Sequence, residues 1–166
     1  MARKSHARGL HPAAPWPLTL LVTWGGLGLV PRAPGTFGSL GALPFAMLIS
    51  WAAGPWGLVA ASFAVFGLGW WASEVYVRRV QQKDPGQVVI DEVAGQWLTL
   101  AAAPLDPAYY ALGFVLFRIF DIFKPWPVRW ADRRLNGGLG IMADDMLAGV
   151  YAGLILWAVA TVVPFL

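Results

Sequence analysis

The feature that most limits what this chain can fold into is a long stretch, residues 33–73, that contains no Asp, Glu, Lys or Arg. A helix that crosses a membrane needs about 20 predominantly apolar residues. The stretch is too long for one such helix and roughly matches two, and Gly54-Pro55 interrupts it near the middle. It therefore predicts two apolar helices, near residues 39–53 and 55–73.

Shorter apolar segments lie between polar loops in the rest of the chain. Residues 16–30 are apolar but short for a crossing, which favours an interfacial or re-entrant segment. Three further apolar helices are expected, beginning at Asp91-Glu92, at Asp106-Pro107 (and ending at about Lys124) and at Asp144-Asp145. The last two should be joined by a basic loop with Arg129, Arg133 and Arg134.

These segments predict an all-α fold, namely a polytopic helical membrane protein with about four to five apolar helices and an N-terminal interfacial segment. The composition agrees, because 58% of the 166 residues are hydrophobic and only 13% are charged, whereas soluble domains contain about 25% charged residues. Residues 1–15 are expected to be a flexible basic tail, and residues 16–166 a single domain.

The basic residues form three clusters that fit one side of a membrane. They lie in the tail, around Arg78–Lys83 and around Arg129–Arg134, and an even number of expected passes separates each pair of clusters. Because cytoplasmic loops carry an excess of Lys and Arg, all three are expected on the cytoplasmic side. The net charge of +3 therefore indicates membrane-flanking loops and no nucleic-acid partner.

Missing residue types exclude several kinds of catalysis. The chain has no Cys, which excludes a thiolate nucleophile and a zinc–thiolate site. Its two histidines, His6 and His11, lie in the basic tail, which excludes a pair of catalytic histidines in the apolar region. Catalysis must therefore rest on carboxylates, basic groups or hydroxyls, with an oxygen-preferring metal ion as the expected cofactor.

Five of the nine carboxylates stand where apolar segments meet polar loops, and they are the candidate site residues: Asp91, Glu92, Asp121, Asp144 and Asp145. A carboxylate beside a membrane helix is costly unless it is paired or bound to a cation. Taken alone, Asp144-Asp145 is explained equally well by capping of a helix N-terminus, and Asp91-Glu92 somewhat better by a solvated helix start. Asp121 differs, because Arg118, Asp121 and Lys124 lie along one face of an apolar helix.

Carboxylates that converge from three segments can hold one or two Mg²⁺ ions. Arg118 and Lys124 can bind phosphate oxygens through charge-assisted hydrogen bonds. The glycine-rich segment 34–39, which follows Arg32 and includes Thr36, can bring backbone N–H groups close to an anion, although helix packing explains its glycines equally well. A metal ion together with cations at a phosphate is typical of phosphoryl transfer to water.

Four stretches of the chain together resemble the phosphatidylglycerophosphatase A family. They are PRAPGTFGSLGA (31–42), VVIDEVAGQW (88–97), FRIFDIFKPWPVRWAD (117–132) and GGLGIMADDMLAG (137–149). The resemblance implies an all-helical, Mg²⁺-dependent enzyme of the bacterial cytoplasmic (inner) membrane that converts phosphatidylglycerophosphate to phosphatidylglycerol and phosphate in phospholipid biosynthesis. Its partners would be the phospholipid substrate and the bilayer, with the active site facing the cytoplasm.

The resemblance singles out these residues, and their chemistry suggests an individual role for each. Metal ligands would be Asp91, Glu92, Asp144 and Asp145. Catalytic residues would be Asp121, Asp144 and Asp145, and phosphate-binding residues would be Arg32, Thr36, Arg118 and Lys124.

Two other classes of membrane protein compete with this assignment. A CDP-alcohol phosphotransferase needs a D-G-x2-A-R run, whereas Asp121 is followed by Ile-Phe-Lys. A small polytopic transporter or channel subunit remains the alternative, and it would place functional carboxylates near the middle of the bilayer on several full helices.

Overall fold

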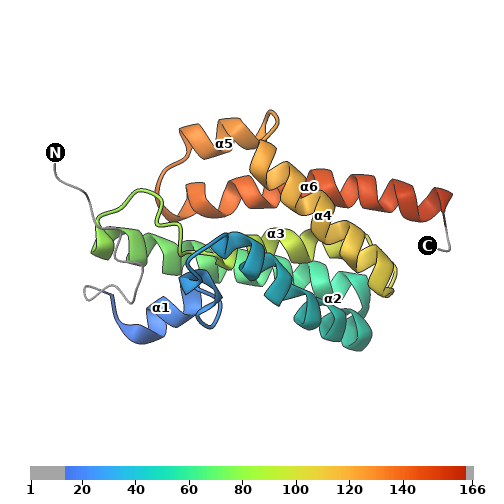
Figure 1. Ribbon diagram of the computed structural model, residues 1–166, viewed down its shortest axis with the longest axis horizontal. Helices are drawn as coiled ribbons and strands as arrows, with labels where there is room; N and C mark the ends of the chain where they lie inside the picture. Colours follow the sequence, from blue (N-terminus) through green and yellow to red (C-terminus); the bar gives the residue numbers. More distant parts are fainter. Residues whose placement is uncertain (1–13, 164–166) are drawn as a thin grey trace.

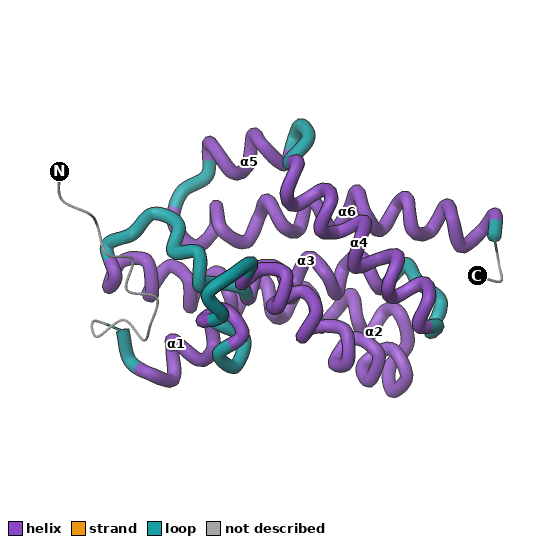
Figure 2. The backbone as a smooth tube through the Cα atoms, in the orientation of Figure 1, coloured by secondary structure: helices purple, strands orange, loops and turns teal. Residues whose placement is uncertain are grey.

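The computed structural model describes residues 14–163, and within them the chain is helical and contains no strand (Figures 1 and 2). The elements in chain order are α1 (Trp16–Val22), the 3₁₀ turn η1 (Leu27–Leu29), α2 (Pro34–Val80), α3 (Ile90–Leu100), α4 (Pro107–Phe123), α5 (Val128–Arg134) and α6 (Gly137–Val162). This confirms the predicted all-α class. Nearly all of the predicted tail, with His6 and His11, lies outside the described residues.

The helix α2 is two helices joined by a tight reversal at Gly54. This residue has φ 68° and ψ −173°, a conformation that glycine adopts readily and that strains other residues. Pro55 then begins the second half, because the proline ring fixes a φ angle that suits the first turn of a helix. The halves pack together, since Ala42 and Ala46 share a buried cluster with Leu58. The predicted break at Gly54-Pro55 is therefore confirmed, and Figure 1 shows the chain turning back at this point.

The ends of α4 follow from local chemistry that the sequence displays. The Asp106 carboxylate accepts a hydrogen bond from the N–H of Ala108 at 2.8 Å, and Pro107 occupies the first helical position. At the other end Lys124 adopts a left-handed conformation with φ 44°, and Pro125 cannot continue the helix. The expected helix from Asp106-Pro107 to about Lys124 is therefore confirmed.

Two predicted elements are wrong. The segment with Arg129, Arg133 and Arg134 is the helix α5 and not a loop, because Val128 and Ala131 bury one face of it against α4 and α6. The last helix begins at Gly137, about two turns before Asp144-Asp145. Its start is supported from another helix, since Glu74 of α2 accepts a hydrogen bond from the N–H of Gly138 at 2.7 Å.

Within residues 14–163, α2 taken over both halves and α6 are long and apolar enough to cross a membrane. Large apolar side chains are exposed on the outside of the bundle, and Trp51 and Trp56, at the Gly54 reversal, are 75% and 81% exposed. An exposed apolar surface of this kind suits contact with lipid, and tryptophan is frequent at membrane interfaces. The expected number of four to five apolar helices stays a prediction.

Candidate active site

A cavity of about 380 Å³ lies where the start of α3, the end of α4 and the first turns of α6 meet. All five predicted carboxylates line it, together with Arg118 and Lys124. Most of the charged residues that the fold gathers at this cavity are therefore ones predicted from the sequence.

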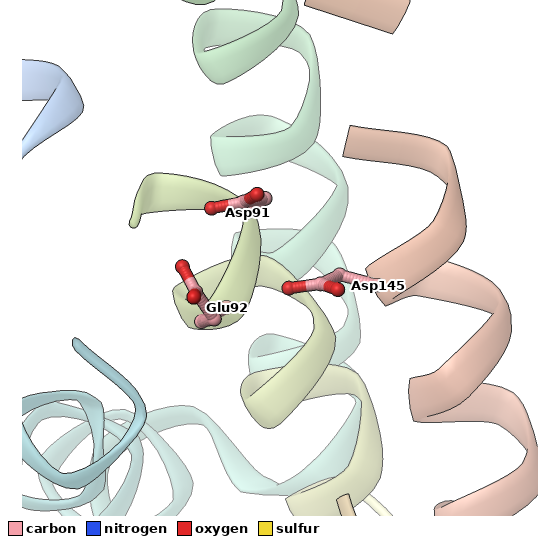
Figure 3. A group of neighbouring side chains, drawn as sticks. All are labelled: Asp91, Glu92 and Asp145. Atoms are coloured by element: carbon pink, nitrogen blue, oxygen red, sulfur yellow. The ribbon is translucent and has the colours of Figure 1, made fainter. Parts of the chain in front are cut away.

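Three of the carboxylates form a compact group (Figure 3). Asp91 and Glu92 stand in the first turn of α3, and Asp145 reaches them from α6. One carboxylate oxygen from each lies within 4.8 Å of the other two. We call Asp91, Glu92 and Asp145 the carboxylate triad.

Close helix packing brings the triad together. A Cβ atom placed on Gly149 of α6 would lie 2.6 Å from the main-chain oxygen of Gly95 of α3, so any side chain there would push the helices apart. On the other side of α3, Gly35 of α2 leaves room for the Glu92 carboxylate, which a Cβ atom would strike. Glycines in three helices thus fix the position of the triad.

The triad suits a divalent cation. Each member has a buried oxygen without a hydrogen-bond partner in residues 14–163: Asp91 Oδ1, Glu92 Oε2 and Asp145 Oδ2. Burial raises the pKa of Asp91 well above its usual range and that of Glu92 to about 8, and neighbouring carboxylates add to the shift at Asp91. Carboxylate oxygens without donors in an environment that disfavours negative charge fit a hard cation such as Mg²⁺.

Two cations stand beside the triad, each held by carboxylates. Arg118 Nη1 lies 2.6 Å from Asp121 Oδ2 and 3.9 Å from Glu92 Oε1. It also donates a hydrogen bond to Ser39 Oγ at 3.4 Å. Asp121 therefore orients the guanidinium toward the triad.

Lys124, at the end of α4, is the second cation that lines the cavity. Its ammonium pairs with Asp132 at 2.8 Å and with Asp144. Burial lowers the pKa of Lys124, but the charge of Asp144 and the hydrogen bonds to both carboxylates outweigh this effect and leave the pKa above its usual range. The side chain therefore stays an ammonium ion at physiological pH.

Asp144 and Asp145 are separated by their helix positions. Both are buried about two turns inside α6, so helix capping does not explain them. Asp145 joins the triad, whereas Asp144 pairs with Lys124. The adjacent pair thus serves two different partners.

Some predicted residues do not reach the cavity, and others were missed. Arg32 is exposed, and neither Arg32 nor Thr36 lines the cavity wall, although their neighbours Pro34 and Gly35 do. The missed lining residues with charge are Lys83, Asp84 and Asp132. Asp132 closes the FRIFDIFKPWPVRWAD stretch, and its partner Lys124 lies in the same stretch, which was the signal available for it.

Comparison with known proteins shows which family the chain resembles. The family model described as phosphatidylglycerophosphatase A matches residues 20–160. A relative named phosphatidylglycerophosphatase A from Escherichia coli is 43% identical over 86% of this chain and 82% of its own length. One of the same name from Haemophilus influenzae is 36% identical over 86% of this chain and 88% of its own length.

A third relative carries a different name. It is a putative phosphatidylinositol-3-phosphatase from Bacteroides thetaiotaomicron, 40% identical over 85% of this chain and 91% of its own length. No solved structure matches the chain. The family match spans the cavity and all its carboxylates, and the chain belongs to the phosphatidylglycerophosphatase A family.

Proposed function

We propose that the protein is a phosphoric monoester hydrolase that removes the terminal phosphate of phosphatidylglycerophosphate and leaves phosphatidylglycerol. Family membership and the names of two relatives support this substrate. The observation that carries the chemistry is the carboxylate triad, whose unpartnered oxygens stand in a cavity also lined by Arg118 and Lys124.

Asp91, Glu92 and Asp145 would hold Mg²⁺, whereas Asp144, predicted as a fourth ligand, pairs with Lys124 instead. When bound, Mg²⁺ supplies a Lewis acid for phosphate oxygens and makes water a better nucleophile near neutral pH. The donor set supports this ion, because it consists of carboxylate oxygens and contains no nitrogen or sulfur ligand.

Arg118 and Lys124 would both bind oxygens of the phosphate. Each is fixed by a carboxylate, Asp121 for Arg118 and Asp144 for Lys124, so little reorientation is needed as charge develops. Asp144 Oδ1 is buried and has no hydrogen-bond partner within the described chain. We assign it the task of accepting the proton of the attacking water as the phosphorus–oxygen ester bond breaks. The departing glycerol oxygen then takes up a proton from solvent water, and Asp144 returns its own proton to solvent.

The cavity also provides a route for a lipid. Ile122 lines the cavity and is nevertheless 64% exposed, and the neighbouring Phe123 is exposed as well. Acyl chains can therefore rest on apolar surface outside the bundle while the head group reaches the triad. A soluble phosphate ester has no acyl chains that could contact this apolar surface.

We place the enzyme in the bacterial cytoplasmic membrane as a multi-pass protein, with the cavity on the cytoplasmic side. The two halves of α2 and the long α6 supply apolar length for crossings. The cavity is lined by Lys83 and lies near the arginines at the end of α2 and in α5, and such basic residues favour the cytoplasmic side. Carboxylates gathered at one cavity also argue against the transporter alternative, which needs them along the helices.

The test is phosphate release from phosphatidylglycerophosphate in mixed micelles, with Mg²⁺ and with EDTA. We expect turnover with Mg²⁺, loss with EDTA, and loss in Asp144→Asn and Asp145→Asn. An inactive wild-type protein would overturn the substrate, and turnover that ignores chelation would overturn the metal site. Near-normal turnover in both variants would overturn the roles given to α6.

A further inference from the structure

Among the basic residues that line the cavity, Lys83 differs from the other two. Arg118 and Lys124 are each engaged in ion pairs with carboxylates. Lys83 lines the same cavity and is exposed, and it makes no ion pair within residues 14–163. It is therefore a cation at the cavity wall that is available for an anion from outside.

The loop that carries Lys83, residues 81–89, is anchored to the rest of the fold. The Gln87 side chain donates a hydrogen bond to the Tyr76 hydroxyl, and the N–H of Val89 donates to the last carbonyl of α1 at 2.8 Å. Gly28 in η1 packs so closely against the Gln87 carbonyl that a Cβ atom would overlap it. The short N-terminal helix and η1 thus hold this loop against the cavity.

The substrate of the proposed function carries two phosphate groups. The terminal monoester is the one to be cleaved, and a phosphodiester, one glycerol unit away, carries another negative charge. The triad with its metal, Arg118 and Lys124 suits the monoester. A second charge at a distance needs a separate cation, and a lysine ammonium on a long flexible stem is suited to a single phosphate oxygen.

We propose that Lys83 forms a second anion subsite, which binds the phosphodiester of the lipid substrate and makes the enzyme prefer head groups that carry it. This inference rests on the proposed function. The loop that carries Lys83, which contacts α1 and η1, would then take part in substrate choice and not in bond cleavage.

The two products separate the two subsites experimentally. Inorganic phosphate is the product of the cleaved monoester and is expected to bind where the triad, Arg118 and Lys124 lie, whereas phosphatidylglycerol retains only the phosphodiester. In full-length Lys83→Ala we expect KM for phosphatidylglycerophosphate and the inhibition constant of phosphatidylglycerol in mixed micelles to rise about tenfold, the usual effect of losing one hydrogen bond to a charged group. The inhibition constant of inorganic phosphate and kcat should not change, and Lys83→Arg should restore KM.

Arg79→Ala is the matched control, because Arg79 is a nearby exposed cation that does not line the cavity. An equal rise of KM in this variant would show a general surface-charge effect and overturn the subsite. So would an unchanged KM in Lys83→Ala, or a parallel rise in the inhibition constant of inorganic phosphate. Failure of the proposed function is distinguishable, since the wild-type protein itself would then release no phosphate from the lipid.

Discussion

Gly95 of α3 lies directly against the main-chain carbonyl of Asp145 of α6, and a Cβ atom on Gly95 would come within 2.5 Å of that oxygen. The same glycine also faces the ring of Phe117. The close approach of the two helices that carry the carboxylate triad therefore requires glycine at position 95 as well as at position 149.

Gly95→Ala should separate α3 from α6 and spread the triad. Forcing a methyl group into a filled interface typically costs about 1–3 kcal/mol. We expect a lower Tm and a lower apparent affinity for Mg²⁺, so that half-maximal activity requires a higher Mg²⁺ concentration. Gly67→Ala is the control, since a Cβ atom there meets nothing within 4 Å. If both variants reached half-maximal activity at the same Mg²⁺ concentration, close packing at Gly95 would not be what positions the triad.

Lys124→Met should reduce kcat far more than it changes KM. The ammonium is held in place by Asp132 and Asp144, so its charge is available to phosphate oxygens without reorganisation. Loss of one preorganised donor of this kind lowers kcat by about 10²–10³-fold. Steady-state kinetics on the lipid substrate measures the effect, and Arg133→Met, which removes an exposed charge in α5, should leave kcat intact. A Lys124→Met enzyme with normal kcat would remove Lys124 from the chemistry.

Stability without a metal ion should fall as the pH rises. In α3, which is too short to cross a bilayer, burial raises the pKa of Glu92 from 4.5 to about 8, and the pKa of Asp91 is raised too. Below the unfolded pKa both states are protonated and the full stability is present. Between about 4.5 and 8 the unfolded chain loses its protons more readily, so folding becomes less favourable.

Thermal unfolding of the EDTA-treated protein from pH 5 to pH 8 measures this linkage. Tm should fall across the range, and Mg²⁺ should restore it most strongly at pH 8, because the ion binds deprotonated carboxylates. Glu92→Gln should flatten the profile. A Tm that rises with pH in the presence of EDTA would contradict the electrostatics described for the triad.

Glu74→Ala should destabilise the start of α6 by about 1 kcal/mol, the usual cost of losing a cap at a helix N-terminus. The carboxylate accepts the N–H of Gly138, and Arg78 pairs with it at 2.7 Å on the exposed side. Glu74→Gln keeps an acceptor and should lose less in Tm. Arg78→Ala should have a small effect, since exposed ion pairs contribute little. A larger loss in Arg78→Ala than in Glu74→Ala would contradict the capping role.

The parts of the fold that could be predicted from the sequence rest on local signals. Gly54-Pro55 breaks an uncharged stretch. Asp106-Pro107 and Lys124-Pro125 mark the two ends of α4, and each signal lies in the residues next to the helix end itself. The start of α6 could not be predicted this way. Gly137-Gly138 is typical of a turn, and its helical role depends on Glu74, 64 residues away in the chain.

The site was predictable in residue type but not in pairing. The sequence shows Asp144 and Asp145 side by side, and nothing local tells which one faces α3. Helix phase and the contact of Gly95 with α6 decide it, sending Asp145 to the triad and Asp144 to Lys124. α5 escaped prediction for a related reason, because its arginines and flanking prolines suggest a loop while Val128 and Ala131 are buried only through tertiary contacts.

The central claim is that Asp91, Glu92 and Asp145 together hold the divalent cation on which hydrolysis depends. Binding of Mn²⁺ as a probe for Mg²⁺, measured by electron paramagnetic resonance on the purified full-length protein, tests it most directly. Asp106→Asn, at an exposed helix cap remote from the triad, is the control. The account predicts that wild-type protein and Asp106→Asn bind Mn²⁺, that Mg²⁺ displaces it, and that Asp145→Asn loses the binding while remaining folded. Wild-type affinity for Mn²⁺ in a folded Asp145→Asn variant would contradict it.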